Sequence, residues 1–297
     1  MAKLAELTCT RTDLLDLLLR HLAAKSVLTQ DGNGTYAVTE LGARLREDHP
    51  ASLRAHLTAD GLFGRADLAL VNILHTVRTG EPAHATVFGR SYWESVNEDP
   101  AFVEALEQTE SLPQPGWGGE LIFESYDWSK VRSVVDVGGH SGAVLMELLR
   151  QQPHLRGTLL DLKNAAKVAG RRFAAAGLAD RADAVVGDFF EPLPAGADVY
   201  LLSALLADWS DEQATAILRR CAEAAGPRGK ILLAEVNLQV PREDPDSAAL
   251  ELWLRATMPS PVRTVEQLKA LGTAAGLTLT WEGPATPVRS ILEFSPC

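Results

Sequence analysis

Hydrophobic residues in the second half of the chain form short runs, separated by longer segments with helical spacing. From Val131 onward the pattern predicts strands at residues 134–137, 158–162, 184–186, 199–202, 230–235, 277–281 and 290–294. It predicts helices between them, chiefly at residues 165–176, 211–225 and 265–275. Strands that alternate with helices are typical of an α/β fold with a parallel sheet.

The pattern differs at residues 11–48, where it predicts a small winged-helix unit. Helical spacing begins at Thr12, which is expected to cap the helix. Strand-like runs at residues 26–29 and 35–39 flank the sequence Asp31-Gly-Asn-Gly34, and Asp-Gly and Asn-Gly steps favour a hairpin. A winged helix serves either in DNA binding or as a structural or dimerisation unit inside an enzyme.

Residues 51–110 have helical spacing that Gly80-Glu-Pro82 interrupts. Phe88, Tyr92 and Trp93 form an aromatic cluster there, which belongs either to the core or to the wall of a pocket. Residues 111–118 are rich in Pro and Gly and are expected to form a loop before the α/β region.

Composition limits the possible functions. The 297 residues, of which 46% are hydrophobic, suffice for one or two domains with a substantial core. No apolar run reaches the roughly 18 residues of a membrane span, and no signal-peptide pattern is present, so a cytoplasmic location is expected. Cys9, Cys221 and Cys297 are expected to be free thiols, and we expect no metal site. The net charge of −11 disfavours nucleic acid as a partner, and so favours the structural interpretation of the winged helix.

The stretch from Val134 to Gly142, Val-Val-Asp-Val-Gly-Gly-His-Ser-Gly, carries the clearest candidate chemistry. A predicted strand ends there in a glycine-rich turn, and helical spacing begins at Ala143. This arrangement binds nucleotide-like ligands, because glycines let the backbone approach closely and the helix N-terminus offers free N–H groups. Asp161 ends the next strand, where an acid accepts hydrogen bonds from ribose hydroxyls. Together they predict an adenosine-type cofactor, although a glycine turn also occurs for packing alone.

Several predicted strands end in polar or glycine residues. Ligands of open α/β sheets bind beyond the carboxyl ends of the strands. This rule places the following residues at one crevice: Gly138 to Gly142, Asp161, Asp188, Phe189, Ser203 and Glu235.

With these motifs the chain resembles the S-adenosylmethionine-dependent small-molecule O-methyltransferases that have a winged-helix dimerisation domain, in particular the bacterial branch acting on aromatic polyketides. The stretches that carry the resemblance are His75–Pro82, Tyr126–Ser129, Val134–Gly139, Gly187–Phe190, Asp208–Glu212 and Ile291–Phe294. The resemblance implies a Rossmann-like sheet of seven strands with the last one antiparallel. It also implies a winged-helix and helical domain at residues 1–110, for dimerisation and for covering the substrate, and a catalytic domain at residues 111–297.

The resemblance also implies residue roles. Gly138 and Gly142 are expected to contact the amino-acid end of S-adenosylmethionine, and Asp161 its ribose. Asp188 and Phe189 are expected to hold the adenine.

On the acceptor side, Ser203 is expected beside the sulfonium or carboxylate region of the cofactor. Glu235 falls where many members have a glutamate that steadies the catalytic base, and it is otherwise an ordinary strand-end acid. Trp117, Trp253 and Met258 are candidate walls for a flat aromatic substrate, or plain core residues.

The chain departs from the family at three places. His140 stands where the family has a third glycine, and it either points out of the site, narrows it or adds an acid/base group. Ala207 stands where many members have a histidine base, so transfer is expected to rest on positioning, with help from Asp208 unless that acid caps the helix at 211–225. The family's dimerising helices before the winged helix are not in this sequence, so either the homodimer is expected to be weakened or the natural start lies upstream. Prolines replace a glycine-basic loop at 258–264.

Three functions follow from these observations. The first is an O-methyltransferase acting on an aromatic polyketide-type natural product. The second is a non-methylating hydroxylase, decarboxylase or cyclase on the same scaffold, in which His140 handles a proton and the cofactor is structural or absent. The third is a DNA-binding regulator, which the charge disfavours.

Overall fold

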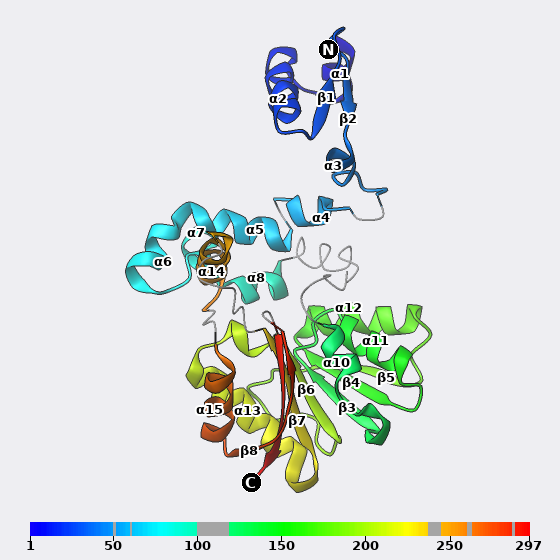
Figure 1. Cartoon of the computed structure of the whole chain (residues 1–297), viewed down its shortest axis with the longest axis vertical. Helices are drawn as coiled ribbons and strands as arrows, with labels where there is room; N and C mark the ends of the chain where they lie inside the picture. Colours follow the sequence, from blue (N-terminus) through cyan, green and yellow to red (C-terminus); the bar gives the residue numbers. More distant parts are fainter. Residues whose placement is uncertain (50–51, 60, 100–118, 237–244, 260–262, 287–288) are drawn as a thin grey trace. The chain divides into compact units, whose positions relative to one another are not determined.

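The computed structural model describes residues 1–49, 52–59, 61–99, 119–236, 245–259, 263–286 and 289–297. The chain forms two compact units, Met1–Phe63 and Gly64–Cys297 (Figure 1). The domain boundary predicted between residues 110 and 111 lies outside the described residues, as does the predicted loop at 111–118.

The first unit contains the predicted helix and hairpin. Its elements are α1 (Ala2–Leu7), α2 (Thr12–Ala24), β1 (Leu28–Gln30), β2 (Tyr36–Val38), α3 (Glu40–Ala43) and α4 (Arg54–Leu57). The Asp31 carboxylate accepts hydrogen bonds from the N–H groups of Asn33 and Thr35, which closes the turn between the two antiparallel strands. The prediction that Thr12 caps α2 is wrong: Arg11 occupies the cap position, and its side chain makes no capping hydrogen bond.

Short helices open the second unit. They are α5 (Leu62–Ala69), which begins at the boundary, η1 (Leu70–Asn72), α6 (Ile73–Thr79), α7 (His84–Phe88) and α8 (Tyr92–Glu98). Gly80 ends α6 with φ +78°, a left-handed conformation that glycine adopts without strain, as the predicted break requires. Further along the chain, α14 (Pro245–Thr257) packs against α6.

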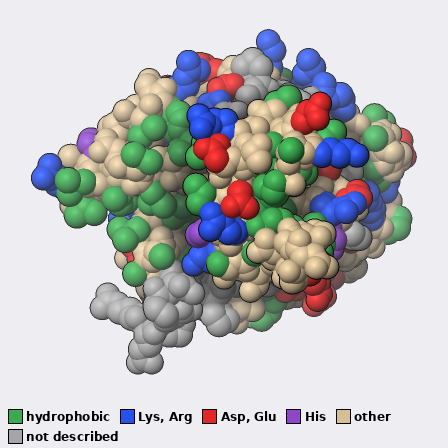
Figure 2. Space-filling view, turned by 90° about the horizontal axis from the view of Figure 1, so that it is seen from above, with side chains coloured by type: hydrophobic (Ala, Val, Ile, Leu, Met, Phe, Trp, Pro, Cys, Tyr) green, Lys and Arg blue, Asp and Glu red, His purple; other side chains and the backbone are tan. Residues whose placement is uncertain are grey.

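The surface around α6 exposes an apolar face. Val71, Leu74 and Val77 are 82%, 52% and 67% exposed. Figure 2 shows hydrophobic side chains gathered at the left of the view, the side on which α6 lies in Figure 1. So contiguous an exposed apolar surface is typical of a contact with another molecule.

A seven-stranded sheet forms the centre of the second unit. Its strands are β3 (Ser133–Val137), β4 (Arg156–Asp161), β5 (Ala182–Val186), β6 (Val199–Ser203), β7 (Lys230–Val236), β8 (Leu277–Ala285) and β9 (Arg289–Pro296). The order is β5-β4-β3-β6-β7-β9-β8, in which β9 runs antiparallel to both of its neighbours. The predicted doubly wound sheet with an antiparallel last strand is therefore confirmed, and its order reverses beside β3.

Helices cover both faces of this sheet (Figure 1). On one face α10 (Glu120–Glu124), η2 (Trp128–Lys130), α11 (Ala143–Gln151) and α12 (Lys163–Ala175) enclose an apolar core. On the other face α13 (Asp211–Ala225) and α15 (Val265–Ala274) enclose a second one. Leu145, Leu148 and Leu149 on α11 are fully buried, and each such side chain stabilises the fold by about 1.5–3 kcal/mol. The two cores hold the carboxyl ends of the parallel strands at one edge.

Candidate active site

The glycine turn lies between β3 and α11, at the point where the strand order reverses. Gly138 and Gly142 have φ values of +66° and +77°. A Cβ at Gly138 would lie 2.8 Å from Leu205 Cδ1, and one at Gly142 would lie 2.6 Å from Phe173 Cε1. Both positions therefore require glycine for conformation and for space. The turn leaves the N-terminal N–H groups of α11 facing the crevice, as a bound anion or polar ligand requires.

Asp161 ends β4 directly beside this turn. Its Oδ2 accepts a hydrogen bond of 2.8 Å from the His140 N–H, and its Oδ1 accepts one of 2.7 Å from the Leu162 N–H. Each carboxylate oxygen can accept a further hydrogen bond. The side chain is thus fixed in direction and keeps acceptor capacity for a pair of hydroxyl groups.

His140 holds a left-handed backbone conformation, with φ +53°. Its ring lies 6.5 Å from the Trp93 ring, centroid to centroid, in an edge-to-face arrangement. Burial lowers the pKa of His140, Arg172 acts in the same direction, and Asp161 opposes both. The ring is therefore neutral at neutral pH and lies toward α8, and whether it narrows the site stays a prediction.

Two further predicted residues follow β5. Phe189 is buried, with its ring 5.5 Å from that of Trp209, and a Cβ at Gly138 would lie 3.5 Å from its Cε1. The exposed Asp188 accepts a hydrogen bond from the Phe190 N–H, which fixes its direction. The structure therefore brings Phe189 to the glycine turn, with Asp188 next to it.

Asp136 belongs to the same motif but was not among the predicted site residues. Its side chain is 1% exposed, and neither carboxyl oxygen has a hydrogen-bond partner among the described residues. Burial, and then the charge of Asp161, raise the pKa of Asp136 to about 7. A buried carboxyl without partners is costly, and a cationic group bound beside it would remove that cost. The signal in the sequence is the acid two positions before the first glycine of the turn.

A second acidic pair lies at the ends of β6 and β7. Glu235 accepts hydrogen bonds from the N–H groups of Leu206 (2.8 Å) and Val236 (2.9 Å), and so holds the turn η3 (Leu206–Asp208). Burial raises the pKa of Glu235. Burial, and then Glu235, raise the pKa of Asp208 well above its usual value, and burial, and then Asp208, raise the pKa of Tyr92. The alternative role for Asp208 as a helix cap is wrong, because Ser210 forms the capping box of α13.

Two buried arginines accompany this acidic pair. Arg263 donates to the carbonyls of Leu206 and Trp209 and to the Asp211 carboxylate, at 2.5–2.8 Å. Arg289 donates from Nη1 to Ser203 Oγ at 3.1 Å. The sequence patterns indicated neither arginine.

The three residues predicted to form the walls of the substrate pocket differ in what the structure shows of them. Trp117 lies outside the described residues. Trp253 is half-buried and donates from Nε1 to Asp67 Oδ1 at 2.7 Å, which ties α14 to α5. Met258 is buried just beyond α14. The wall role of all three stays a prediction.

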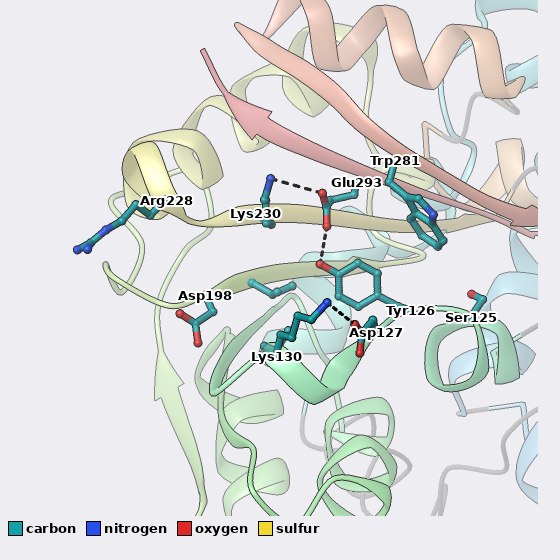
Figure 3. A pocket seen from close by; sticks show the side chains of 11 residues that line it. Ser125, Tyr126, Asp127, Lys130, Asp198, Arg228, Lys230, Trp281 and Glu293 are labelled. Carbon is teal, nitrogen blue, oxygen red and sulfur yellow. Dashed lines mark hydrogen bonds and ion pairs between the residues drawn. The ribbon is translucent and has the colours of Figure 1, made fainter.

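A cavity of about 490 Å³ opens near the amino ends of β6 and β7, at the sheet edge opposite the glycine turn (Figure 3). Its polar groups pair with one another: Tyr126 Oη donates to Glu293 at 2.6 Å, Lys230 lies 3.5 Å from Glu293, and Lys130 lies 3.1 Å from Asp127. None of the predicted site residues lines it. We therefore place the candidate active site at the carboxyl edge, in agreement with the rule for open α/β sheets.

Comparison with known proteins agrees with this fold and site. The model of the O-methyltransferase domain matches residues 71–278, and the chain belongs to this family. It is 41% identical over 298 residues to 2,7-dihydroxy-5-methyl-1-naphthoate 7-O-methyltransferase from Streptomyces carzinostaticus, covering 99% of this chain and 87% of that protein. It is 40% identical over 305 residues to aclacinomycin 10-hydroxylase RdmB from Streptomyces purpurascens, covering 99% and 81%.

A solved structure gives the same picture. The O-methyltransferase NcsB1 from neocarzinostatin biosynthesis, in complex with S-adenosylmethionine and 2-hydroxy-5-methyl naphthoic acid, superposes with a TM-score of 0.87. It is 41% identical, and the match covers 100% of this chain and 89% of that one. The predicted family, the methyltransferase activity and S-adenosylmethionine as cofactor are thereby confirmed.

The residues present fit this cofactor. Asp161 offers acceptors for a diol, Asp136 is a buried carboxyl without a partner among the described residues, and α11 presents its N-terminus. In the part of the chain that the structure describes, no helix is long and apolar enough to cross a membrane, and no cluster of side chains has the composition of a metal site. The predicted absence of nucleic acid partners is not tested and stays a prediction.

Proposed function

We propose that the protein methylates a phenolic hydroxyl of a small polycyclic aromatic natural product. The single observation that carries this proposal is the acidic carboxyl edge of the sheet. Asp136 and Asp161 lie beside the glycine turn there, and Asp208 lies on η3. Several relatives support the acceptor class: their names include hydroxynaphthoates, a phenazine and an aminohydroxybenzoate as substrates.

S-adenosylmethionine supplies an electrophilic methyl group on a positively charged sulfur. Gly138 and Gly142 would hold its amino-acid end, Asp136 would face the ammonium group of that end, and Asp161 would hold its ribose. Asp188 and Phe189 take the adenine, by a hydrogen bond and a ring contact. The fixed direction of Asp161, which two backbone N–H groups hold, makes this pocket rigid before the ligand arrives.

Proton removal from the acceptor needs little help from the protein. Ala207 cannot accept a proton, and a phenol loses one readily, so alignment of the two reactants supplies most of the rate. Asp208 lies on the adjacent turn with a raised pKa, which makes its carboxylate a stronger base than an ordinary one. Glu235 holds the turn that carries Asp208 and is therefore a positioning residue.

The test is an acceptor panel with isotopically labelled methyl donor. We expect label transfer to hydroxynaphthoates and related phenols, with the product an aryl methyl ether by NMR. We expect no transfer to the same ring systems in which every hydroxyl is already methylated. Label on carbon or nitrogen, or transfer to none of the phenols, would overturn the proposal.

A second candidate function is hydroxylation on the same scaffold. One specific observation favours it: the 40% identical relative from Streptomyces purpurascens is named a 10-hydroxylase. In that case Ala207 would reflect a site without base catalysis, and His140 would handle the proton. Incubation under ¹⁸O₂ distinguishes the two, because a hydroxylase incorporates label into the product whereas a methyltransferase does not.

A further inference from the structure

Arg289 occupies a fixed place at the carboxyl edge of the sheet. It is the first residue of β9 and pairs with Val236, the last residue of β7. Its N–H donates to Thr286 Oγ1 at 3.0 Å, and its carbonyl accepts from the Thr286 N–H at 2.7 Å. The pairing with β7 and the hydrogen bonds with Thr286 together set the direction in which the Arg289 side chain leaves the strand.

The Arg289 guanidinium is buried but incompletely hydrogen-bonded. The residue is 6% exposed, its Nη1 donates to Ser203 Oγ, and its Nε has no hydrogen-bond partner among the described residues. A guanidinium has five N–H donors, and burying one unused costs free energy.

Arg263, which is also buried, differs from Arg289 in the hydrogen bonds that its guanidinium makes. Arg263 is 3% exposed, and its Nε, Nη1 and Nη2 each donate to a protein oxygen at 2.8 Å or less. The hydrogen bonds of Arg263 therefore account for a structural role, whereas Arg289 retains an N–H donor without a partner among the described residues.

The charges around Arg289 do not use these donors either. Glu235 and Glu120 favour the charged form of Arg289, although burial lowers its pKa. The hydrogen bonds of the Glu235 carboxylate in the structure come from the backbone N–H groups of Leu206 and Val236. Glu235 and Glu120 thus stabilise the positive charge of Arg289 without accepting a hydrogen bond from it among the described residues. The coplanar N–H donors of its guanidinium suit the two oxygens of a bound carboxylate.

We propose that Arg289, oriented by Ser203, binds the carboxylate of an aromatic hydroxy acid and so selects acids among the possible acceptors. This inference rests on the proposed function, of which it defines the substrate class. A carboxylate matches the planar donor fork of arginine, and one fixed end of a flat ring system orients the hydroxyl to be methylated.

Two carboxylates reach this edge of the sheet, that of the acceptor and that of the methionine part of the cofactor. The strand order favours the acceptor. The groups assigned to the cofactor lie on β3, β4 and the turn after β5, whereas Arg289 lies on β9, three strands from β3. With strands about 4.8 Å apart, the backbone of Arg289 lies two strands beyond Ser203, and its guanidinium reaches Ser203 from the β7 side.

The experiment is calorimetric binding in the presence of saturating S-adenosylhomocysteine. The probes are 1-hydroxy-2-naphthoic acid and 1-naphthol, which differ only in the carboxyl group. In Arg289→Gln we expect the Kd of the acid to rise at least tenfold and that of the naphthol to stay within twofold. Arg289→Lys keeps the charge but not the fork, and should fall between the two. Arg219→Gln, which removes an exposed arginine that bonds to the Ala274 carbonyl, is the matched control.

Four other results would overturn the assignment, and a fifth would refute the proposed function alone. Equal weakening of both probes would mean a structural role, which the thermal midpoint of the variant would also show. Unchanged binding of the acid, or failure of the wild-type protein to bind it, would mean that Arg289 holds no acceptor carboxylate. Weaker binding of S-adenosylhomocysteine, with unchanged binding of 5′-methylthioadenosine, which lacks the carboxyl group, would mean that Arg289 binds the carboxylate of the cofactor instead. Tight binding of the acid without its methylation would refute the proposed function and leave Arg289 as an acid-binding residue.

Discussion

At the scale of single residues, the buried carboxylate of Asp136 destabilises the cofactor-free protein, and a bound cofactor can offset this destabilisation. Its folded-state pKa of about 7 lies above the 3.8 of an unperturbed aspartate, so the folded chain binds more protons than the unfolded chain between these values. The free energy of unfolding of the cofactor-free protein therefore falls as the pH rises from about 4 to 7, by up to about 4 kcal/mol.

The first prediction concerns Asp136→Asn. Removal of the buried charge should raise the thermal midpoint of the cofactor-free protein at pH 8, flatten its dependence on pH between 5 and 8, and weaken S-adenosylmethionine at least tenfold. Differential scanning fluorimetry and calorimetry measure these effects. Asp183→Asn, on the exposed side of β5, is the control and should change neither. A lower midpoint at pH 8 for Asp136→Asn would contradict the assignment of an unpaired carboxyl.

The second prediction concerns Asp208→Asn. The carboxylate helps only when ionised, so its contribution to kcat appears as the pH rises through the raised pKa of Asp208. We expect the variant to lose about tenfold in kcat once the pH exceeds the raised pKa of Asp208, and progressively less as the acceptor phenol ionises unaided. The pH profile of kcat at saturating acceptor tests this. A loss by the same factor at every pH would indicate a positioning role alone.

Individual site residues were predictable to unequal degrees. Gly138, Gly142 and Asp161 follow from local geometry, because a turn with positive φ and an acid at the next strand end leave a signature in the sequence. Arg289 left none, since its position depends on the pairing of β9 with β7, more than 50 residues earlier in the chain. From the sequence, Asp208 is a candidate cap of the helix at 211–225, and the structure gives that role to Ser210.

At the scale of elements, the turn η3 is the part of the site that depends most on distant segments. Glu235 holds it from β7, and Arg263 holds it from the segment just before α15. Neither anchor is adjacent in sequence to Leu206–Asp208. The position of Asp208 is therefore determined by packing between two elements and not by the turn itself.

The third prediction is that Arg263→Met destabilises the protein by about 2–4 kcal/mol, because the Leu206 and Trp209 carbonyls lose a buried charged donor. It should also lower kcat more than it raises the KM of the acceptor. Urea unfolding and steady-state kinetics measure these effects. Arg219→Met, which removes one exposed hydrogen bond, should cost less than about 1 kcal/mol and leave kcat unchanged. Equal effects of the two variants would contradict the anchoring role.

The strands themselves were largely predictable. Six of the seven predicted runs agree with the observed strands to within two residues at both ends, because most of these strands appear in the sequence as short apolar runs. The exception is β8, which continues to Ala285, four residues beyond the prediction. Residues 281–284 alternate between half-buried and exposed positions, and they include Gly283 and Pro284, which are turn residues in most contexts.

At the scale of the whole molecule, the exposed apolar face of η1 and α6 points to a homodimer, the assembly that the sequence resemblance implied. Val71, Leu74 and Val77 would bury this surface in a second copy of the chain. The fourth prediction is that light scattering finds a dimer for the wild-type protein and that Val77→Glu shifts it toward monomer. Val186→Glu, on edge strand β5 and 61% exposed, should leave the dimer intact. A monomeric wild type, or equal effects of both variants, would contradict the assignment.

The central claim is that this chain transfers a methyl group, although Ala207 replaces the base and His140 replaces a glycine. The most direct test is the stoichiometry of turnover: aromatic product and S-adenosylhomocysteine, quantified in the same reaction with a hydroxynaphthoic acid acceptor. The account predicts one S-adenosylhomocysteine and one methyl ether for each acceptor consumed. Acceptor consumed without S-adenosylhomocysteine would contradict it, and would make this protein a non-methylating enzyme on a methyltransferase fold.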